Sequence, residues 1–315
     1  MAVRIPPRSV GLPQEVSRPI GIGSLAQREA LLAYLFMLPG AIILLLFMAY
    51  PFFLGIWLSL TNKLVGFSDY DYVGLANYRW FWTDTIFRQS VINTFIYGFV
   101  TVPFKLLFGL FLALLLNERF HFSRFLRAGL LLPWIVPTAI SSLAWLMLFD
   151  GVLSPISWIL KDWGVVNHNI NFLGDAWNAR ASLCLANIWR GIPFFAVSIL
   201  AGLQAVPDDL HEAAALDGAN AWHRFWHVTW PLLLPVTLVV VVFSVIQTFS
   251  DFQLIYVLTG GGPANSTHLI ATYAYQIGVG SGLLGEGAAL SLFMFPVLFM
   301  VVWVQLRYLK RMENG

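Results

Sequence analysis

Charged residues divide the chain into long apolar stretches separated by short polar ones. A helix needs roughly 20 apolar residues to cross the hydrocarbon core of a bilayer, which is about 30 Å thick. Six stretches reach that length with few or no charges inside them. The pattern therefore predicts an all-α membrane protein with six transmembrane helices, at about residues 31–60, 90–116, 128–149, 182–205, 232–256 and 286–307.

Composition strengthens this prediction and excludes several other classes of protein. Hydrophobic residues make up 58% of the 315 residues and charged residues 11%, whereas soluble domains carry about 25% charged residues. A net charge of +2 without a basic run excludes strong nucleic-acid binding. The single cysteine, Cys184, excludes a disulfide framework and a cysteine-based metal site.

The distribution of lysine and arginine predicts the orientation. If the N-terminus is inside, eleven of these residues lie in inner segments: Arg4, Arg8, Arg18, Arg28, Arg119, Arg124, Arg127, Arg224, Arg307, Lys310 and Arg311. Five lie in outer segments: Lys63, Arg79, Arg88, Lys161 and Arg180. The positive-inside rule then predicts that both termini are cytoplasmic. Residues 1–28, with four prolines and no helical period, are expected to form a flexible cytoplasmic tail before a six-span domain at 29–315.

Motifs for catalysis are not evident. No Gly-Lys pair occurs, so there is no Walker A loop and the chain is not expected to bind ATP by that route. His223 and His227 have the i, i+4 spacing of a zinc-binding pair, but neither a third ligand nor a general-base glutamate accompanies them. A polar helix face explains the two histidines better, and an enzyme is not expected.

The segment 207–235, on the predicted cytoplasmic side, is too patterned for a simple connector. Pro207 followed by two aspartates is a favourable helix start, and Gly218 permits a sharp turn before a second helix at 219–228, which Pro231 is expected to end. Such a helix–turn–helix suits a groove in a partner protein. The alternative is an amphipathic hairpin lying on lipid, which a lysine- and arginine-rich face would favour; Arg224 is the only such residue.

This segment resembles the EAA loop of the permease subunits of ATP-binding-cassette importers in bacteria. The motif Glu-Ala-Ala, three residues, Gly, nine residues, Ile, any residue, Leu-Pro is matched except that Val228 and Trp230 replace the Ile and Leu. The stretches LGIWLSLTN, VGLANY, LLPWIVP, IWRGIPFFAVSILAGLQAVP and VLTGGGPANST also look like maltose-type sugar permeases. The resemblance covers most of the chain from about residue 30, and it implies the type I importer fold.

The resemblance also implies the partners and the location of the chain. Such a subunit lies in the bacterial inner membrane, pairs with a second homologous permease, rests on two ATPase subunits that bind the ATP and Mg, and receives sugar from an extracytoplasmic binding protein. No cofactor is expected in this chain. The residues implied to couple it to the ATPases are Glu212, Ala213, Ala214, Asp217, Gly218 and Pro231.

Polar residues inside spans indicate where a carbohydrate would pass, because hydroxyls leaving water need hydrogen-bonding partners. Span five carries four polar residues at i, i+3, i+4 and i+7, which is one helix face, and span four carries an arginine before a Gly-x-Pro element. The resemblance places the family's sugar contacts on the same segments. The predicted substrate pathway is Arg190, Gly191, Phe194, Ser244, Gln247, Thr248 and Asp251.

Several alternatives remain open at this stage. Arg190 and Asp251 could instead form a buried ion pair that holds spans four and five together. Lys105, whose neighbours in span two are apolar, suggests a packing or assembly role rather than a place in the site. The cargo could be a sugar, a polyol or a glycerol-phosphate compound, and a transporter or channel without ATPase partners is a less favoured reading.

Overall fold

A computed structural model describes residues 22–118 and 123–313 of the chain, with the side chains of 29–118 and 125–311. The chain forms two units, Met1–Leu54 and Gly55–Gly315. The described residues are mostly helical, and outside the helices they contain one isolated antiparallel bridge, between Thr61 and Tyr72. The predicted all-α class is confirmed.

The first unit is one apolar helical stretch. It comprises α1 (Ile22–Leu44), a π-helical turn η1 (Leu45–Ala49) and the start of α2 (Tyr50–Ser59). The π turn ends with a hydrogen bond from the N–H of Tyr50 to the Leu45 carbonyl, directly before Pro51, which has no N–H to continue the helical ladder. Helix α1 begins inside the segment predicted to be a tail, since Leu, Ala, Gln and Glu at 25–30 favour a helix; residues 1–21 of that segment lie outside the described residues.

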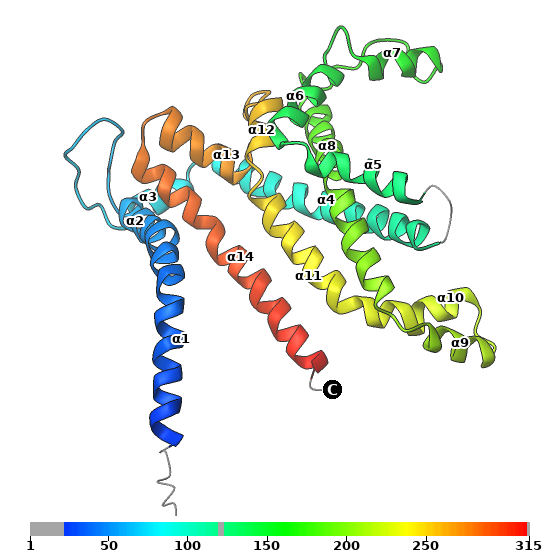
Figure 1. The fold of residues 1–315 in the computed structure, drawn as a ribbon. Helices are drawn as coiled ribbons and strands as arrows, with labels where there is room; N and C mark the ends of the chain where they lie inside the picture. The colour runs from blue at the N-terminus through cyan, green and yellow to red at the C-terminus, as the bar shows by residue number, and fades with distance from the viewer. Residues whose placement is uncertain (1–21, 119–122, 314–315) are drawn as a thin grey trace, which may run out of the picture. The chain divides into compact units, whose positions relative to one another are not determined.

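The second unit contains the remaining helices (Figure 1). In chain order they are α3 (Ala76–Phe81), α4 (Thr85–Asn117), α5 (Ser123–Ile135), α6 (Thr138–Leu148), α7 (Pro155–Asp162), α8 (Ala176–Gln204), α9 (Asp208–Leu216), α10 (Ala221–Arg224), the π turn η2 (Phe225–Thr229), α11 (Trp230–Phe249), α12 (Gln253–Leu258), α13 (Ile270–Tyr275), the π turn η3 (Gln276–Gly280) and α14 (Leu284–Glu313). In the described part of the chain, five helices are long and apolar enough to cross a membrane, or six if α5 and α6 count as one bent span.

The third predicted span is not a straight helix. Helix α5 ends at Ile135, α6 begins at Thr138, and the two axes differ by 93°. Pro137 stands at the break with an extended backbone (ψ 135°). Proline lacks the N–H that would continue the helix, and it disfavours helical geometry in the residue before it. The prediction of one unbroken helix at 128–149 is therefore wrong, and the cause is visible in the sequence.

The fifth predicted span differs at both ends. It starts earlier, because helix runs unbroken from Ala221 to Phe249 and Pro231 does not end it. The π turn before Pro231 has its last hydrogen bond from Trp230 N–H to the Phe225 carbonyl, which accommodates the proline. The helix also stops at Phe249, so the segment predicted to continue to 256 is divided between α11 and α12.

The core of the second unit lies among α4, α8 and α11, which lie side by side (Figure 1). Helices α4 and α8 share the largest interface between helices. A glycine makes the close approach possible: a Cβ on Gly109 would lie 2.3 Å from Cβ of Phe195. Small residues at such crossings let two backbones pack closely within lipid. The core is lined by Val102, Ala113, Leu116, Phe195, Ile199, Leu200, Leu203, Leu233 and Val240.

A buried histidine in the 259–269 connection is expected to make the stability of this region depend on pH. His268 is 2% exposed, with Nδ1 3.2 Å from Thr272 Oγ1 and its ring against Tyr273. Burial lowers the pKa of His268 below its ordinary value of 6.5, although a hydrogen bond with Gln276 acts in the opposite direction. The folded state therefore holds the neutral imidazole more firmly than the unfolded chain does.

We expect the thermal unfolding temperature of the purified protein to fall as pH is lowered from about 7 to about 5, because the unfolded chain then takes up a proton that the folded state resists. His268→Gln should flatten this dependence. The exposed His168 provides the control, since His168→Gln should leave the pH profile unchanged. An identical profile for wild type and His268→Gln would contradict the expectation.

Candidate substrate cavity and coupling loop

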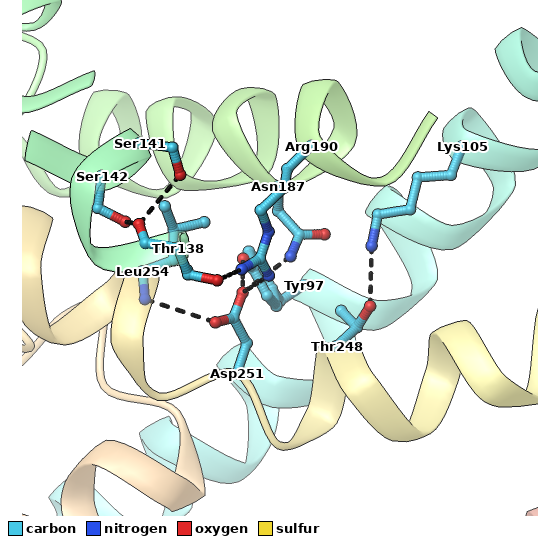
Figure 2. A network of polar contacts seen from close by, with 10 residues as sticks. All are labelled: Tyr97, Lys105, Thr138, Ser141, Ser142, Asn187, Arg190, Thr248, Asp251 and Leu254. Carbon is cyan, nitrogen blue, oxygen red and sulfur yellow. Dashed lines mark hydrogen bonds and ion pairs between the residues drawn. The ribbon is translucent and has the colours of Figure 1, made fainter. Parts of the chain in front are cut away.

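The carboxylate of Asp251 is the centre of a buried polar network that joins four helices (Figure 2). Its Oδ2 accepts hydrogen bonds from Tyr97 (3.0 Å) in α4 and from Asn187 (2.8 Å) and Arg190 (3.3 Å) in α8. Arg190 also donates to Thr138 of α6 at 2.6 Å. The ion pair between Arg190 and Asp251, considered in the sequence analysis, is thus present.

Asp251 holds this position because the helix is interrupted there. Its Oδ1 lies 3.5 Å from the N–H of Leu254, at the start of α12. A short aspartate side chain that bonds nearby backbone groups competes with helical hydrogen bonding and favours a break. The same interruption carries Asp251 off the face shared by Ser244, Gln247 and Thr248, so the predicted continuation of one face to i+7 is wrong.

A cavity of about 230 Å³ lies beside this network. Its polar groups come from α4, α6, α8 and α11, and its apolar wall is aromatic, with Trp134 stacked on Phe194 and Phe243 5.1 Å from the same ring. Polar groups set against an aromatic wall are typical of ligand sites. The lining residues are Lys105, Trp134, Thr138, Asn187, Arg190, Gly191, Phe194, Phe195, Phe243, Ser244, Gln247 and Thr248.

The structure brings six of the seven predicted pathway residues around this cavity: Arg190, Gly191, Phe194, Ser244, Gln247 and Thr248. Asp251 is not in the wall and instead holds Arg190 and Asn187 in place. Contact of these residues with a substrate stays a prediction.

Six cavity residues fall outside the sequence-based set: Lys105, Trp134, Thr138, Asn187, Phe195 and Phe243. Lys105 was expected to have a packing role, yet it lines the cavity and donates to Thr248 Oγ1 at 2.9 Å. Asn187 lies one turn before Gly191 on α8, so a search for polar residues at i−4 from the Gly-x-Pro element would have found it. For Lys105 the signal is the single charge within an apolar span. Its place in the cavity depends on the packing of α4 against α8 and α11, which spacing does not show.

The loop that follows α8 forms the predicted helix–turn–helix. Helix α9 carries Asp208 and Asp209 in its first turn, where carboxylates complement the helix dipole. Gly218 has φ +82°, a left-handed conformation that residues with a Cβ adopt only at a cost. Asn220 then caps α10 by accepting from the N–H of His223 at 2.9 Å. The hairpin lies at the end of α8 and α11 that is opposite to α12 and α13 (Figure 1).

Side chains of this hairpin extend into the surroundings rather than into a core. None of the residues of α9 is buried, Leu216 is 90% exposed and Trp222 is 67% exposed. The carboxylate of Glu212 is exposed and, within residues 22–118 and 123–313, has no hydrogen-bond or ion-pair partner. Exposed apolar residues around an unpaired carboxylate are typical of surfaces that bind a partner.

The two histidines of this hairpin, His223 and His227, lie against each other. Their rings are stacked with centroids 5.6 Å apart, and Nδ1 of His227 lies 3.0 Å from the carbonyl of His223. No group of three His, Cys, Asp or Glu residues suited to a metal ion occurs among the described residues.

Comparison with known proteins identifies the family. The model of the family "Binding-protein-dependent transport system inner membrane component" matches residues 105–314, which include the cavity, the hairpin and the last span. The chain belongs to this family. It is therefore a multi-pass inner-membrane component, the permease subunit of an ATP-binding-cassette importer.

Individual relatives match the permease over nearly its whole length. The trehalose/maltose transport system permease protein MalF of Thermococcus litoralis is 37% identical over 91% of this chain and 97% of that protein. The sulfoquinovosyl glycerol transport system permease protein SmoG of Agrobacterium fabrum is 35% identical, over 90% and 91%. The sn-glycerol-3-phosphate transport system permease protein UgpA of Pectobacterium atrosepticum is 29% identical, over 91% and 97%.

A solved structure confirms the fold. The permease superimposes with a TM-score of 0.78 on a chain of a bacterial transporter that imports the acidic polysaccharide alginate, covering 92% of this chain and 98% of that one at 21% identity. At this identity the likeness shows the type I importer permease fold and nothing of the cargo.

Proposed function

We propose that this permease forms half of the translocation pathway for a carbohydrate, which an extracytoplasmic binding protein delivers. The observation that carries the proposal is the cavity between α8 and α11, where hydrogen-bonding groups face an aromatic wall. Sugars combine hydroxyls, which must be paired on leaving water, with C–H faces that pack on aromatic rings. The named cargo of two similar permeases, trehalose/maltose and sulfoquinovosyl glycerol, agrees with this chemistry.

The coupling end of the permease is the hairpin 207–231. In this proposal both termini are cytoplasmic, and Glu212, Ala213, Ala214, Asp217, Gly218 and Pro231 transmit the movement of two ATPase subunits to α8 and α11. The exposed, unpaired Glu212 and the exposed Leu216 support docking into a protein groove more than lying on lipid. A second homologous permease completes the pathway. The bacterial alginate transporter, one chain of which is similar to this permease, was solved in complex with a periplasmic protein that holds an alginate pentasaccharide.

ATP and Mg belong to the partner subunits in this account, and the chain contributes no catalytic site of its own. The permease acts as a lever: ATP binding closes the ATPases, the docked hairpin moves with them, and the spans expose the cavity to opposite sides in turn. A polyol or glycerol-phosphate cargo is the second candidate, favoured by the similarity to the glycerol-phosphate permease.

Uptake into liposomes tests the proposal. The permease is reconstituted with its second permease, its ATPases and its binding protein, and supplied with maltose, trehalose, glycerol, glucuronate, sulfoquinovosyl glycerol or sn-glycerol-3-phosphate. We expect ATP-dependent uptake of a glycoside. Uptake of glycerol or glycerol phosphate alone would favour the second candidate, and no uptake of any of the six would contradict the proposed cargo class.

A further inference from the structure

Lys105 is a cation buried inside the membrane-spanning region with few partners. It is 4% exposed, and its Nζ makes a single hydrogen bond among the described residues, to Thr248 Oγ1 at 2.9 Å. An ammonium has three N–H donors, so two are unused. Burying a lysine in a span is costly, and residues retained there mark sites of function more often than packing.

The side chain of Lys105 reaches the cavity by passing over the face of α8 that carries Gly191. A Cβ on Gly191 would lie 2.6 Å from both Cδ and Cε of Lys105, so the aliphatic stem passes directly over that glycine. Asn187 lies one turn away on the same face of α8 and lines the same cavity. Larger residues at 191 would push the ammonium away from Thr248.

Asn187 supplies a hydrogen-bond acceptor in this part of the cavity. Its Nδ2 donates to Asp251 at 2.8 Å, and since a carboxylate only accepts, the amide cannot be the other way round. Its Oδ1 is buried and has no partner among the described residues. In the view of Figure 2, that oxygen lies on the side of the carboxamide toward Lys105.

A donor-only ammonium and an acceptor-only oxygen in one cavity match hydroxyl groups, which both accept and donate. A carboxylate or sulfonate would satisfy the ammonium but set its lone pairs against Asn187 Oδ1. The nearby carboxylate of Asp251 accepts hydrogen bonds from Tyr97, Asn187 and Arg190 and none from Lys105 among the described residues. The remaining N–H donors of Lys105 are therefore available to a ligand.

We propose that Lys105 is a specificity-determining residue of this permease, which donates hydrogen bonds to hydroxyls of a neutral carbohydrate in the cavity. The inference rests on the proposed function and adds a residue and a cargo class to it. Thr248 orients the ammonium, and Gly191 provides the space for the stem. The single charge of span two marks Lys105 in the sequence, but the spacing of span two does not show that it reaches the cavity.

Uptake by the reconstituted importer, with the six compounds named above, tests the inference. We expect wild type to take up a neutral disaccharide, maltose or trehalose. Lys105→Met should lower that uptake about ten- to a hundredfold, the value of one charge-assisted hydrogen bond. Lys105→Arg keeps the hydrogen-bond donors and the charge, so this variant should retain more uptake of the disaccharide than Lys105→Met does. Lys161→Met, at an exposed lysine of α7, should have no effect.

Specificity and assembly distinguish this role from a purely structural one. Monodeoxy forms of the transported disaccharide should be discriminated by wild type, and Lys105→Met should lose that discrimination at one position while the complex still assembles. Unchanged neutral-sugar uptake in Lys105→Met, or a loss matched by an equal loss of assembly, would overturn the inference. Uptake of anionic compounds alone would refute the cargo class while leaving the proposed function intact, and no uptake at all would refute both.

Discussion

Replacing Asp251 with asparagine is expected to destabilise the permease by roughly 3 kcal/mol, the low end for a buried pair, because it leaves the half-buried Arg190 without its carboxylate partner. Asp251 is 5% exposed and accepts from Tyr97, Asn187 and Arg190, so one substitution weakens contacts among α4, α8 and the α11–α12 break. Thermal unfolding of the detergent-purified complex measures the effect. Asp162→Asn, at an exposed carboxylate of α7, provides the control.

A double substitution separates lost contacts from the unpaired charge. Combining Arg190→Gln with Asp251→Asn removes both charges, so the double variant should be more stable than Asp251→Asn alone. Unfolding temperatures that fall additively would show that the ion pair contributes no coupling. In that case the network would act only through its neutral hydrogen bonds.

Changing the turn of the coupling hairpin is expected to abolish uptake while the protein still assembles in the membrane. Gly218 has φ +82°, and a branched side chain there costs about 1–3 kcal/mol of backbone strain. Among the described residues, no atom of a neighbouring group lies within 4 Å of the position of its Cβ, so we expect the strain to stay local and the spans to be unaffected. Gly218→Val should lose uptake, measured in proteoliposomes, whereas Gly129→Ala in α5 should retain it.

Glu212→Ala tests the same hairpin through its chemistry rather than its shape. The carboxylate has no partner in the described part of the chain, so its removal should cost the fold little and remove the contact with the ATPase that we propose for it. Asp209→Asn, at an exposed residue of the same helix, should keep most of the uptake. Normal uptake by both Glu212→Ala and Gly218→Val would contradict coupling through this hairpin.

The apolar pattern was sufficient to predict the spans, because the length needed to cross lipid is fixed by the bilayer. Their interruptions were less predictable. Pro137, which has no N–H to donate, stands where the third span breaks. Pro231 lies within a continuous helix, directly after a π turn. The sequence does not distinguish these two outcomes. The choice depends on whether neighbouring helices compensate the lost hydrogen bond.

Helical spacing alone predicted candidate site residues only where they lie on one face of a single helix. Ser244, Gln247 and Thr248 share a face of α11, so their spacing was enough. Asp251 follows the end of that helix, and periodicity therefore placed it wrongly. Lys105 reaches the cavity across Gly191, a contact between distant parts of the chain that spacing cannot reveal.

Coupling between ATP hydrolysis and transport tests the central claim most directly. The measurement is substrate uptake into proteoliposomes that contain this permease with its second permease and ATPases, with ATP inside or absent, and with or without the liganded binding protein. We predict uptake only when both ATP and the binding protein are present. Uptake by this chain alone, without ATP, would contradict the account.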